Sequence, residues 1–304
     1  MSEKSMPHLR VPIYSMRSHE TGEYAVLKDG NLQLHLNRAR AGDIIAIPKN
    51  ASDADELREL FPEFEFVPLW YKENAFETRK HFWEENQWVV DSLVEYYDVV
   101  GLVTDITGYK GRHPVWFNFN ITMNPEKPLF YIDQFIEEDV ASVNRSKYTT
   151  VLNQCQKDVL VKHGADDYKI IVDQKVVRPS VIERYAAGLE AIHVNGIFHP
   201  FRISDQCYRF NQVVECAIQT QQPVYITDPN DSFDRSHYPE EAVIRLTKLS
   251  KAEYYQVLKG RPHIQYFENP DKVFHPGLAE FIYFGAFISS PYNIPMYSDV
   301  VINE

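Results

Sequence analysis

Short hydrophobic runs bounded by Gly, Pro and Asn alternate with segments of helical periodicity in the first half of the chain. Helices are expected over 53–60 and 73–96, and the second is long, amphipathic and rich in good helix formers. The short runs predict strands at 9–14, 43–48, 65–70, 99–104, 114–119 and 129–132. Because strands that alternate with helices form parallel βαβ units, this half predicts a doubly wound sheet.

The same alternation continues in the second half of the chain. Strands are expected at 168–172, 197–201 and 223–227, and helices at 179–193, 205–219, 251–258 and 277–288. We therefore expect an α/β protein with two Rossmann-like domains facing a central cleft, the second of them reduced. A boundary near residue 165 would separate domain 1–165 from domain 166–304. The apolar helix at the end would pack back on the first domain.

Composition is that of a folded chain, with 44% hydrophobic and 24% charged residues among 304. The chain has 31 Lys and Arg and 43 Asp and Glu, which gives a net charge of −12. This charge argues against tight, sequence-independent binding to polyanions. It does not exclude contact with nucleic acid through a local basic surface. The three cysteines, Cys155, Cys207 and Cys216, have no C-x-x-C spacing, so neither a disulfide framework nor a zinc site is expected. The chain lacks a signal-peptide core and an apolar run of roughly 18 residues. We expect a cytoplasmic protein without a membrane partner.

Several well-known catalytic motifs are absent from the sequence. It contains no G-x-G-x-x-G, P-loop or kinase motif, no G-x-S-x-G and no H-E-x-x-H. The sequence therefore gives little support to three enzyme classes: dinucleotide-dependent enzymes, nucleotide kinases and hydrolases with a catalytic triad. No visible motif requires a divalent metal.

Open α/β sheets bind ligands at the carboxyl ends of their strands, near the point where the strand order reverses. In the first half, the loop after the first strand carries Arg17, Ser18, His19 and Glu20, which could contact a substrate or form a solvated loop. The helix after the third strand begins at Asn74, and its amino end with Arg79 could face the same cleft. An exposed helix arginine is the alternative for Arg79.

Two aspartates in the first half directly follow predicted strands. Asp105 follows the run 99–104, and Asp133 follows 129–132 between Tyr131 and Phe135. A partly desolvated carboxylate at such a strand end can act as a general base, although either residue could instead cap a helix. The turn after Asp105 adds two basic residues to the expected acceptor side, Lys110 and Arg112.

The stretch 197–215 carries the most specific pattern in the second half. A strand delivers Arg202 and Ser204 to the start of a helix, where charge and backbone N–H groups converge on phosphate. Glu215 lies inside that helix, where it could accept hydrogen bonds from ribose hydroxyls or be an ordinary surface residue. We expect this stretch to bind a nucleotide sugar through Arg202, Ser204, Asp205, Tyr208, Arg209 and Glu215.

The helix with Glu215, followed by the Pro-Val-Tyr-Ile-Thr-Asp run at 223–228, resembles the donor-binding stretch of GT-B glycosyltransferases. The first half is similar in layout to phage DNA β-glucosyltransferase, through 97–98, the turn 108–114 and the run 129–133. The resemblance to the phage enzyme implies a general-base role for Asp133. The resemblance to GT-B donor sites implies that Arg202 lies at the diphosphate and Glu215 at the ribose. Among phage enzymes, arabinosyltransferases that act on 5-hydroxymethylcytosine form the group suggested.

The resemblance implies transfer of a sugar from a UDP-sugar donor, such as UDP-arabinose or UDP-glucose, to a hydroxyl. The acceptor it suggests is 5-hydroxymethylcytosine in double-stranded phage DNA, inside the host cytoplasm. Two alternatives remain open: a nucleotide-sugar-dependent transferase acting on a small metabolite, and a non-catalytic protein that binds nucleotide sugars or saccharides.

Overall fold

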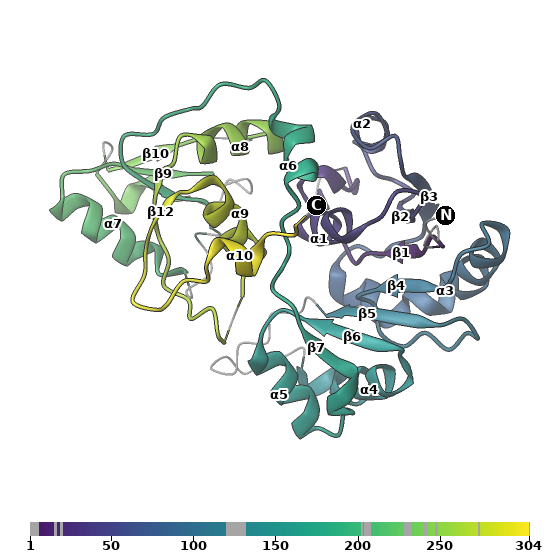
Figure 1. Ribbon diagram of the computed structural model, residues 1–304. Helices are drawn as coiled ribbons and strands as arrows, with labels where there is room; N and C mark the ends of the chain where they lie inside the picture. Colours follow the sequence, from purple (N-terminus) through teal and green to yellow (C-terminus); the bar gives the residue numbers. More distant parts are fainter. Residues whose placement is uncertain are drawn as a thin grey trace. The chain divides into compact units, whose positions relative to one another are not determined.

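The computed structural model describes residues 6–14, 17–18, 21–119, 132–201, 203, 208–227, 233–239, 242–246, 249–272 and 274–303. The chain divides into two compact units, Met1–Gln174 and Lys175–Glu304 (Figure 1). The division follows the last strand of the first sheet.

The first unit contains a parallel sheet with the strand order β3-β2-β1-β4-β5-β6-β7. Its strands are β1 (Leu9–Val11), β2 (Ile44–Pro48), β3 (Glu65–Leu69), β4 (Leu102–Thr104), β5 (Val115–Phe119), β6 (Tyr148–Val151) and β7 (Ile170–Val172). β1 and β2 are buried along their whole length. This agrees with the near-continuous hydrophobic runs expected of parallel strands that are covered on both faces.

Helices connect most of these strands. They are α1 (Gly30–Arg38), α2 (Ala54–Leu60), α3 (Ala75–Tyr96), α4 (Ile132–Arg145) and α5 (Gln154–Lys162), with short 3₁₀ turns at Val26–Lys28 and Asp167–Lys169. Side chains cap three helix starts: Asp29 on α1, Asn74 on α3 and Asn153 on α5. Each accepts a hydrogen bond from a backbone N–H of the first turn, as N-cap residues do.

The second unit has a smaller parallel sheet with the order β10-β9-β8-β11-β12. Its strands are β8 (Ile197–His199), β9 (Val224–Ile226), β10 (Val243–Arg245), β11 (His263–Gln265) and β12 (Phe287–Ser289). Its helices are α6 (Pro179–Ala186), α7 (Phe210–Gln219), α8 (Lys251–Lys259), α9 (Pro276–Phe284) and α10 (Tyr297–Val300). Both sheets therefore begin with the strand order 3-2-1-4 of a doubly wound fold. The order reverses between β1 and β4 in one sheet and between β8 and β11 in the other.

Three predicted elements are wrong in type or extent. The expected helix 179–193 ends at Ala186. The expected strand 129–132 is contradicted at its last residue, because Ile132 begins helix α4; residues 129–131 lie outside the described part of the chain. Asp133 is therefore in the first turn of a helix rather than at a strand end. The expected helix 277–288 stops at Phe284, because Gly285 adopts the left-handed conformation (φ 69°), and the chain continues as β12.

Candidate functional site

Asp105 lies at the carboxyl end of β4, at the point where the order of the first sheet reverses. Its Oδ1 accepts a hydrogen bond from the backbone N–H of Ile13, 2.6 Å away, just beyond β1. The neighbouring Thr104 hydroxyl donates to the Val11 carbonyl at 2.8 Å. These two side chains connect β1 and β4 where the strands separate. The sequence placed Asp105 correctly at a strand end.

His35 of α1 faces the second carboxylate oxygen of Asp105, with 3.6 Å between Nε2 and Oδ2. Both side chains are fully buried, and neither ring nitrogen of His35 nor Oδ2 of Asp105 has a hydrogen-bond partner among the described residues. Burial raises the pKa of Asp105, although His35 and the Ile13 N–H oppose this. Burial lowers the pKa of His35, although the neighbouring Asp105 acts to raise it. Burial therefore disfavours the charged form of each group.

Three tyrosines brace the loops at this carboxyl edge. The Tyr14 hydroxyl donates to the Ala46 carbonyl at 2.9 Å, and the Tyr71 hydroxyl donates to the Pro12 carbonyl at 2.9 Å. Tyr24 donates to the Lys72 carbonyl. Their rings meet edge to face, the arrangement that aromatic quadrupoles favour. The edge of the first sheet is thus held by side-chain bonds between successive strand ends.

Arg79, an expected acceptor contact, is 3% exposed and is ion-paired with Asp139 of α4. The Thr107 hydroxyl donates to the same Asp139 oxygen at 2.9 Å, and the Gly108 N–H donates to Ser142 at 3.0 Å. This arrangement fixes the loop after Asp105 between α3 and α4. Arg79 is therefore buried in an ion pair beneath the edge, which fits neither the expected acceptor contact nor the exposed position given as its alternative.

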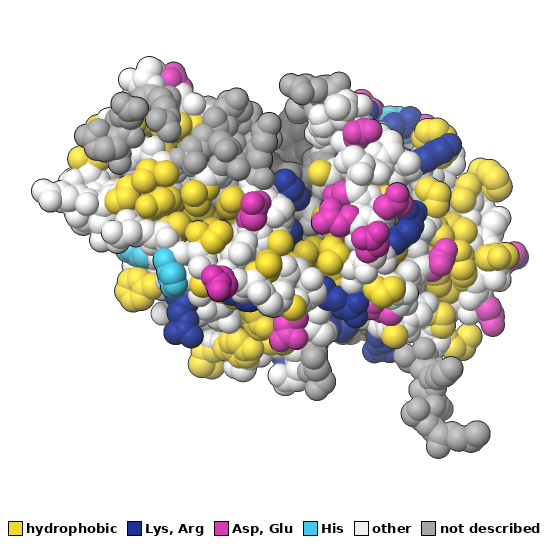
Figure 2. All heavy atoms as spheres, turned by 90° about the horizontal axis from the view of Figure 1, so that it is seen from above, with side chains coloured by type: hydrophobic (Ala, Val, Ile, Leu, Met, Phe, Trp, Pro, Cys, Tyr) yellow, Lys and Arg dark blue, Asp and Glu magenta, His cyan; other side chains and the backbone are white. Residues whose placement is uncertain are grey.

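The other expected acceptor residues do not converge. Arg17 donates to the Gly22 carbonyl near the β1 edge, and Asn74 caps α3 at the β3 edge. Lys110 and Arg112 instead contact Gln87 and Glu95, farther along α3, a helix about 33 Å long. Ser18 is exposed, while His19 and Glu20 lie outside the described residues. On the face shown in Figure 2, acidic and basic side chains are interspersed.

At the carboxyl ends of β8 and β11, aromatic rings gather. The rings of Phe201 and Tyr208 are stacked, with centroids 4.6 Å apart and planes 12° apart. Phe201 also contacts the rings of Tyr266 and His275, and Tyr208 contacts His275 at its edge. Tyr208 and His275 are partly exposed, so this cluster reaches the surface where the order of the second sheet reverses.

Helix α7 starts beside this aromatic cluster, and no described side chain caps its first turn. Its N-cap residue, Arg209, has left-handed backbone torsions (φ 49°, ψ 43°), and its guanidinium lies 5.6 Å from the Phe267 ring centre beyond β11. A cation at the amino end of a helix opposes the helix dipole, so an anion bound there would offset both the charge and the unsatisfied N–H groups. Arg202, Ser204 and Asp205, expected at this helix start, lie outside the described residues.

His199, the last residue of β8, packs against Phe210, the first residue of α7. The side chain is 1% exposed, and neither ring nitrogen has a hydrogen-bond partner among the described residues. Burial lowers the pKa of His199 to about 3. An uncharged imidazole with two unsatisfied nitrogens costs stability unless a ligand or water supplies a partner. Sequence reasoning missed this residue, because a lone histidine in a strand carries no motif.

His199 predicts a pH dependence of folding. Below about pH 6.5 the unfolded chain binds a proton at this residue that the folded chain does not bind. The free energy of unfolding should therefore fall by about 1.4 kcal/mol per pH unit between roughly pH 6 and pH 3. His199→Phe should remove this contribution in denaturant titrations across that range, whereas the exposed His193→Phe should not. An unchanged slope in His199→Phe would show that His199 is protonated in the folded protein.

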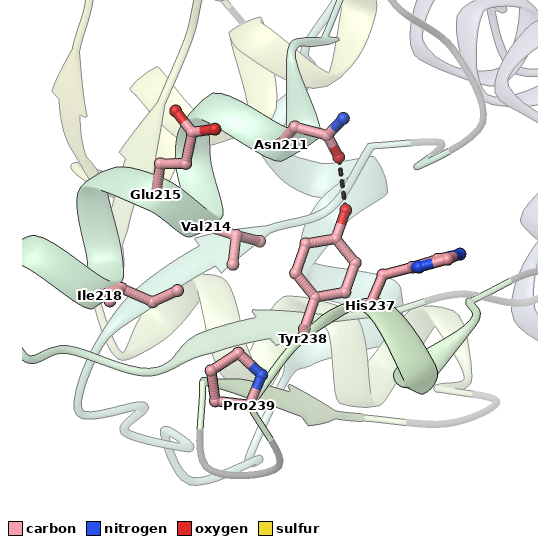
Figure 3. Close-up of a pocket in the computed structure, with 7 residues that line it drawn as sticks. All are labelled: Asn211, Val214, Glu215, Ile218, His237, Tyr238 and Pro239. Carbon is pink, nitrogen blue, oxygen red and sulfur yellow. Dashed lines mark hydrogen bonds between the residues drawn. The ribbon is translucent and has the colours of Figure 1, made fainter.

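Glu215, expected at the ribose, is exposed on α7. It lines a hollow of about 410 Å³ with Asn211, Val214, Ile218, His237, Tyr238 and Pro239. In Figure 3 the Tyr238 hydroxyl donates to Asn211, and the Glu215 carboxylate points away from the Tyr238 ring. An adjoining hollow includes Pro223 and Ala242, which precede β9 and β10 and so lie toward the amino ends of those strands. Glu215 thus flanks the sheet instead of sharing the β8–β11 edge with Arg209.

Within the described ranges, no group of three His, Cys, Asp or Glu side chains is arranged to hold a metal ion. No helix in the part of the chain that the structure describes is long and apolar enough to cross a membrane.

Comparison with solved structures identifies the architecture. HepE from Anabaena in complex with UDP-glucose gives a TM-score of 0.58 at 11% identity, covering 93% of this chain and 80% of that chain. Sucrose-phosphate synthase from Thermosynechococcus elongatus gives 0.60 at 12% identity, covering 93% and 81%. The chain has the GT-B fold. UDP-GlcNAc 2-epimerase from Neisseria meningitidis, bound to UDP-GlcNAc, gives 0.50 at 11% identity, covering 92% and 81%. No protein-family model matches the sequence, and a search of curated proteins gives no significant match.

Proposed function

We propose that the protein is a glycosyltransferase that uses a UDP-sugar donor, bound by the second unit at the carboxyl ends of β8 and β11. The observation that carries this proposal is Arg209 at the start of α7, where no described side chain caps the helix, beside the exposed rim of an aromatic cluster. A helix start with an arginine suits a diphosphate, and the rings suit a base or sugar. HepE, with the same fold, was solved with UDP-glucose, which supports this choice of ligand.

In the proposed reaction, the acceptor hydroxyl oxygen attacks the anomeric carbon of the sugar. The bond from that carbon to the diphosphate breaks, and UDP leaves with the electron pair. Negative charge develops on the diphosphate, where Arg209 and the free N–H groups of α7 would stabilise it. Arg202, Ser204 and Asp205, which lie outside the described residues, remain predicted donor contacts. Glu215 does not share this edge, so its predicted contact with the ribose is not part of the proposal.

We propose that the acceptor binds the first unit and that Asp105 takes its proton. Asp105 lies at the carboxyl edge beside β1, and its Oδ2 lacks a hydrogen-bond partner among the described residues. Because the residue is buried, the acceptor hydroxyl must displace the side chains that cover it. Asp133, now in the first turn of α4, stays the other candidate base. A cytoplasmic location remains a prediction.

For the acceptor we retain 5-hydroxymethylcytosine in DNA, supported by the resemblance of the turn 108–114 to a phage DNA glucosyltransferase. The sequence patterns leave a small-metabolite acceptor and a non-catalytic nucleotide-sugar-binding role as alternatives. The test is mass spectrometry of hydroxymethylated DNA incubated with a panel of UDP-sugars, alongside an assay for free UDP. Added sugar mass with equimolar UDP supports the proposal. UDP release without DNA modification would point to another acceptor, and saturable donor binding without UDP release would show a binding protein.

A further inference from the structure

An exposed tryptophan lies at the carboxyl edge of the first sheet. Trp70 directly follows β3, and 56% of its surface is exposed. The Lys49 ammonium, directly after β2, lies 4.4 Å from the Trp70 ring centre. Open α/β sheets bind ligands at the carboxyl ends of their strands, so this pair of side chains lies where a ligand can be contacted.

A buried residue hydrogen-bonds to the backbone of Trp70 on both its N–H and its carbonyl. Asn86 of α3 is fully buried, accepts a hydrogen bond from the Trp70 N–H at 3.0 Å and donates to the Trp70 carbonyl at 2.8 Å. The Lys49 N–H donates to the Leu69 carbonyl at 3.0 Å. The ring is therefore presented from a rigid strand end, which lowers the entropic cost of binding.

Lys49 places a positive charge directly beside the exposed ring of Trp70. A cation beside a stacking ring is the combination that proteins use to hold single-stranded nucleic acid, in which bases stack and phosphates pair with cations.

We propose that Trp70 and Lys49 form the acceptor platform, on which Trp70 stacks an unpaired nucleobase and Lys49 pairs with its phosphate. This inference rests on the proposed function, because it names the acceptor of that reaction as a nucleobase outside a duplex. Neither residue carries a sequence motif, and Lys49 and Trp70 meet only because β2 and β3 are neighbours in the sheet.

The test is the affinity for a single-stranded oligodeoxynucleotide containing 5-hydroxymethylcytosine, measured with UDP present. Trp70→Ala should weaken binding by roughly 5- to 150-fold, the range for loss of one base–aromatic stack, and Trp70→Phe should recover part of the loss. Trp88→Ala is the matched control, since Trp88 is 72% exposed on α3 away from the strand ends. Lys49→Met should flatten the plot of log affinity against log salt by about 0.7, one phosphate contact.

Titration of UDP alone into the same variants distinguishes failure of the acceptor platform from failure of the proposed donor site. If UDP binds and Trp70→Ala leaves oligonucleotide affinity unchanged, or if the wild-type protein binds no oligonucleotide, the platform is wrong and the donor site stands. If the wild-type protein binds no UDP, the proposed function fails. Equal losses in Trp70→Ala and Trp88→Ala would also overturn the platform.

Discussion

Asp105→Asn should lower the rate of sugar transfer by about 10²–10⁴, the usual effect of losing a general base, while UDP affinity stays unchanged. Asparagine has nearly the same shape and can still accept the hydrogen bond from the Ile13 N–H. It cannot take a proton from the acceptor hydroxyl. The measurement is single-turnover transfer from the active UDP-sugar, run in parallel with Asp133→Asn.

Stability separates catalysis by Asp105 from a purely structural role. Because burial raises the pKa of Asp105, ionising it costs stability as pH rises above the unfolded value of about 3.9. Asp105→Asn avoids this cost, so its free energy of unfolding at pH 7 should equal or exceed that of the wild-type protein. Full activity in Asp105→Asn with a large loss in Asp133→Asn would assign the base to α4. Full activity in both would contradict general-base catalysis by either aspartate.

Arg79→Met should destabilise the fold by about 3–5 kcal/mol, because it leaves the Asp139 carboxylate buried without its cation. The measurement is chemical denaturation at pH 7. The control is Arg112→Met, whose ion pair with Glu95 is exposed and contributes under about 1 kcal/mol.

A double variant, Arg79→Met with Asp139→Leu, should recover most of the stability lost in Arg79→Met, since no buried charge remains unpaired. If Arg79→Met instead unfolds like the wild-type protein but loses oligonucleotide binding, Arg79 is a substrate contact, as its sequence position first suggested.

Hydrophobic runs were enough to predict most strands of the first sheet. The runs at 43–48, 65–70 and 114–119 match β2, β3 and β5 within one residue at each end. Every residue of β2 is buried, as expected of a parallel strand covered on both faces. Helix α1 has no comparable signal, since it buries polar residues such as Gln33, His35 and Asn37. Strands β10 and β11 were not predicted, and β12 lies within the apolar run that predicted the helix 277–288.

The candidate site was predicted only as far as local sequence determines it. Asp105 directly follows a predicted strand, and ligands bind at the carboxyl ends of strands, so Asp105 could be proposed as a site residue from the sequence. His35 and Asp105 are 70 positions apart in sequence, and their approach depends on how α1 packs beside β1 and β4. The sequence alone does not show that Arg79 is buried, because its burial depends on the position of α4. Glu215 follows an apolar residue, Val214, yet lies on the opposite, exposed side of α7.

The most direct test of the account is calorimetric titration of UDP into the wild-type protein and into Arg209→Ala. Arg209 lies at the start of α7, so removing its charge should weaken UDP binding by about 10- to 100-fold, the effect of one charge-assisted hydrogen bond. Arg112→Ala, which removes an exposed cation of the first unit, should leave the affinity unchanged. Equal UDP affinity in Arg209→Ala and the wild-type protein, or no binding of UDP at all, would contradict a donor site at the carboxyl ends of β8 and β11.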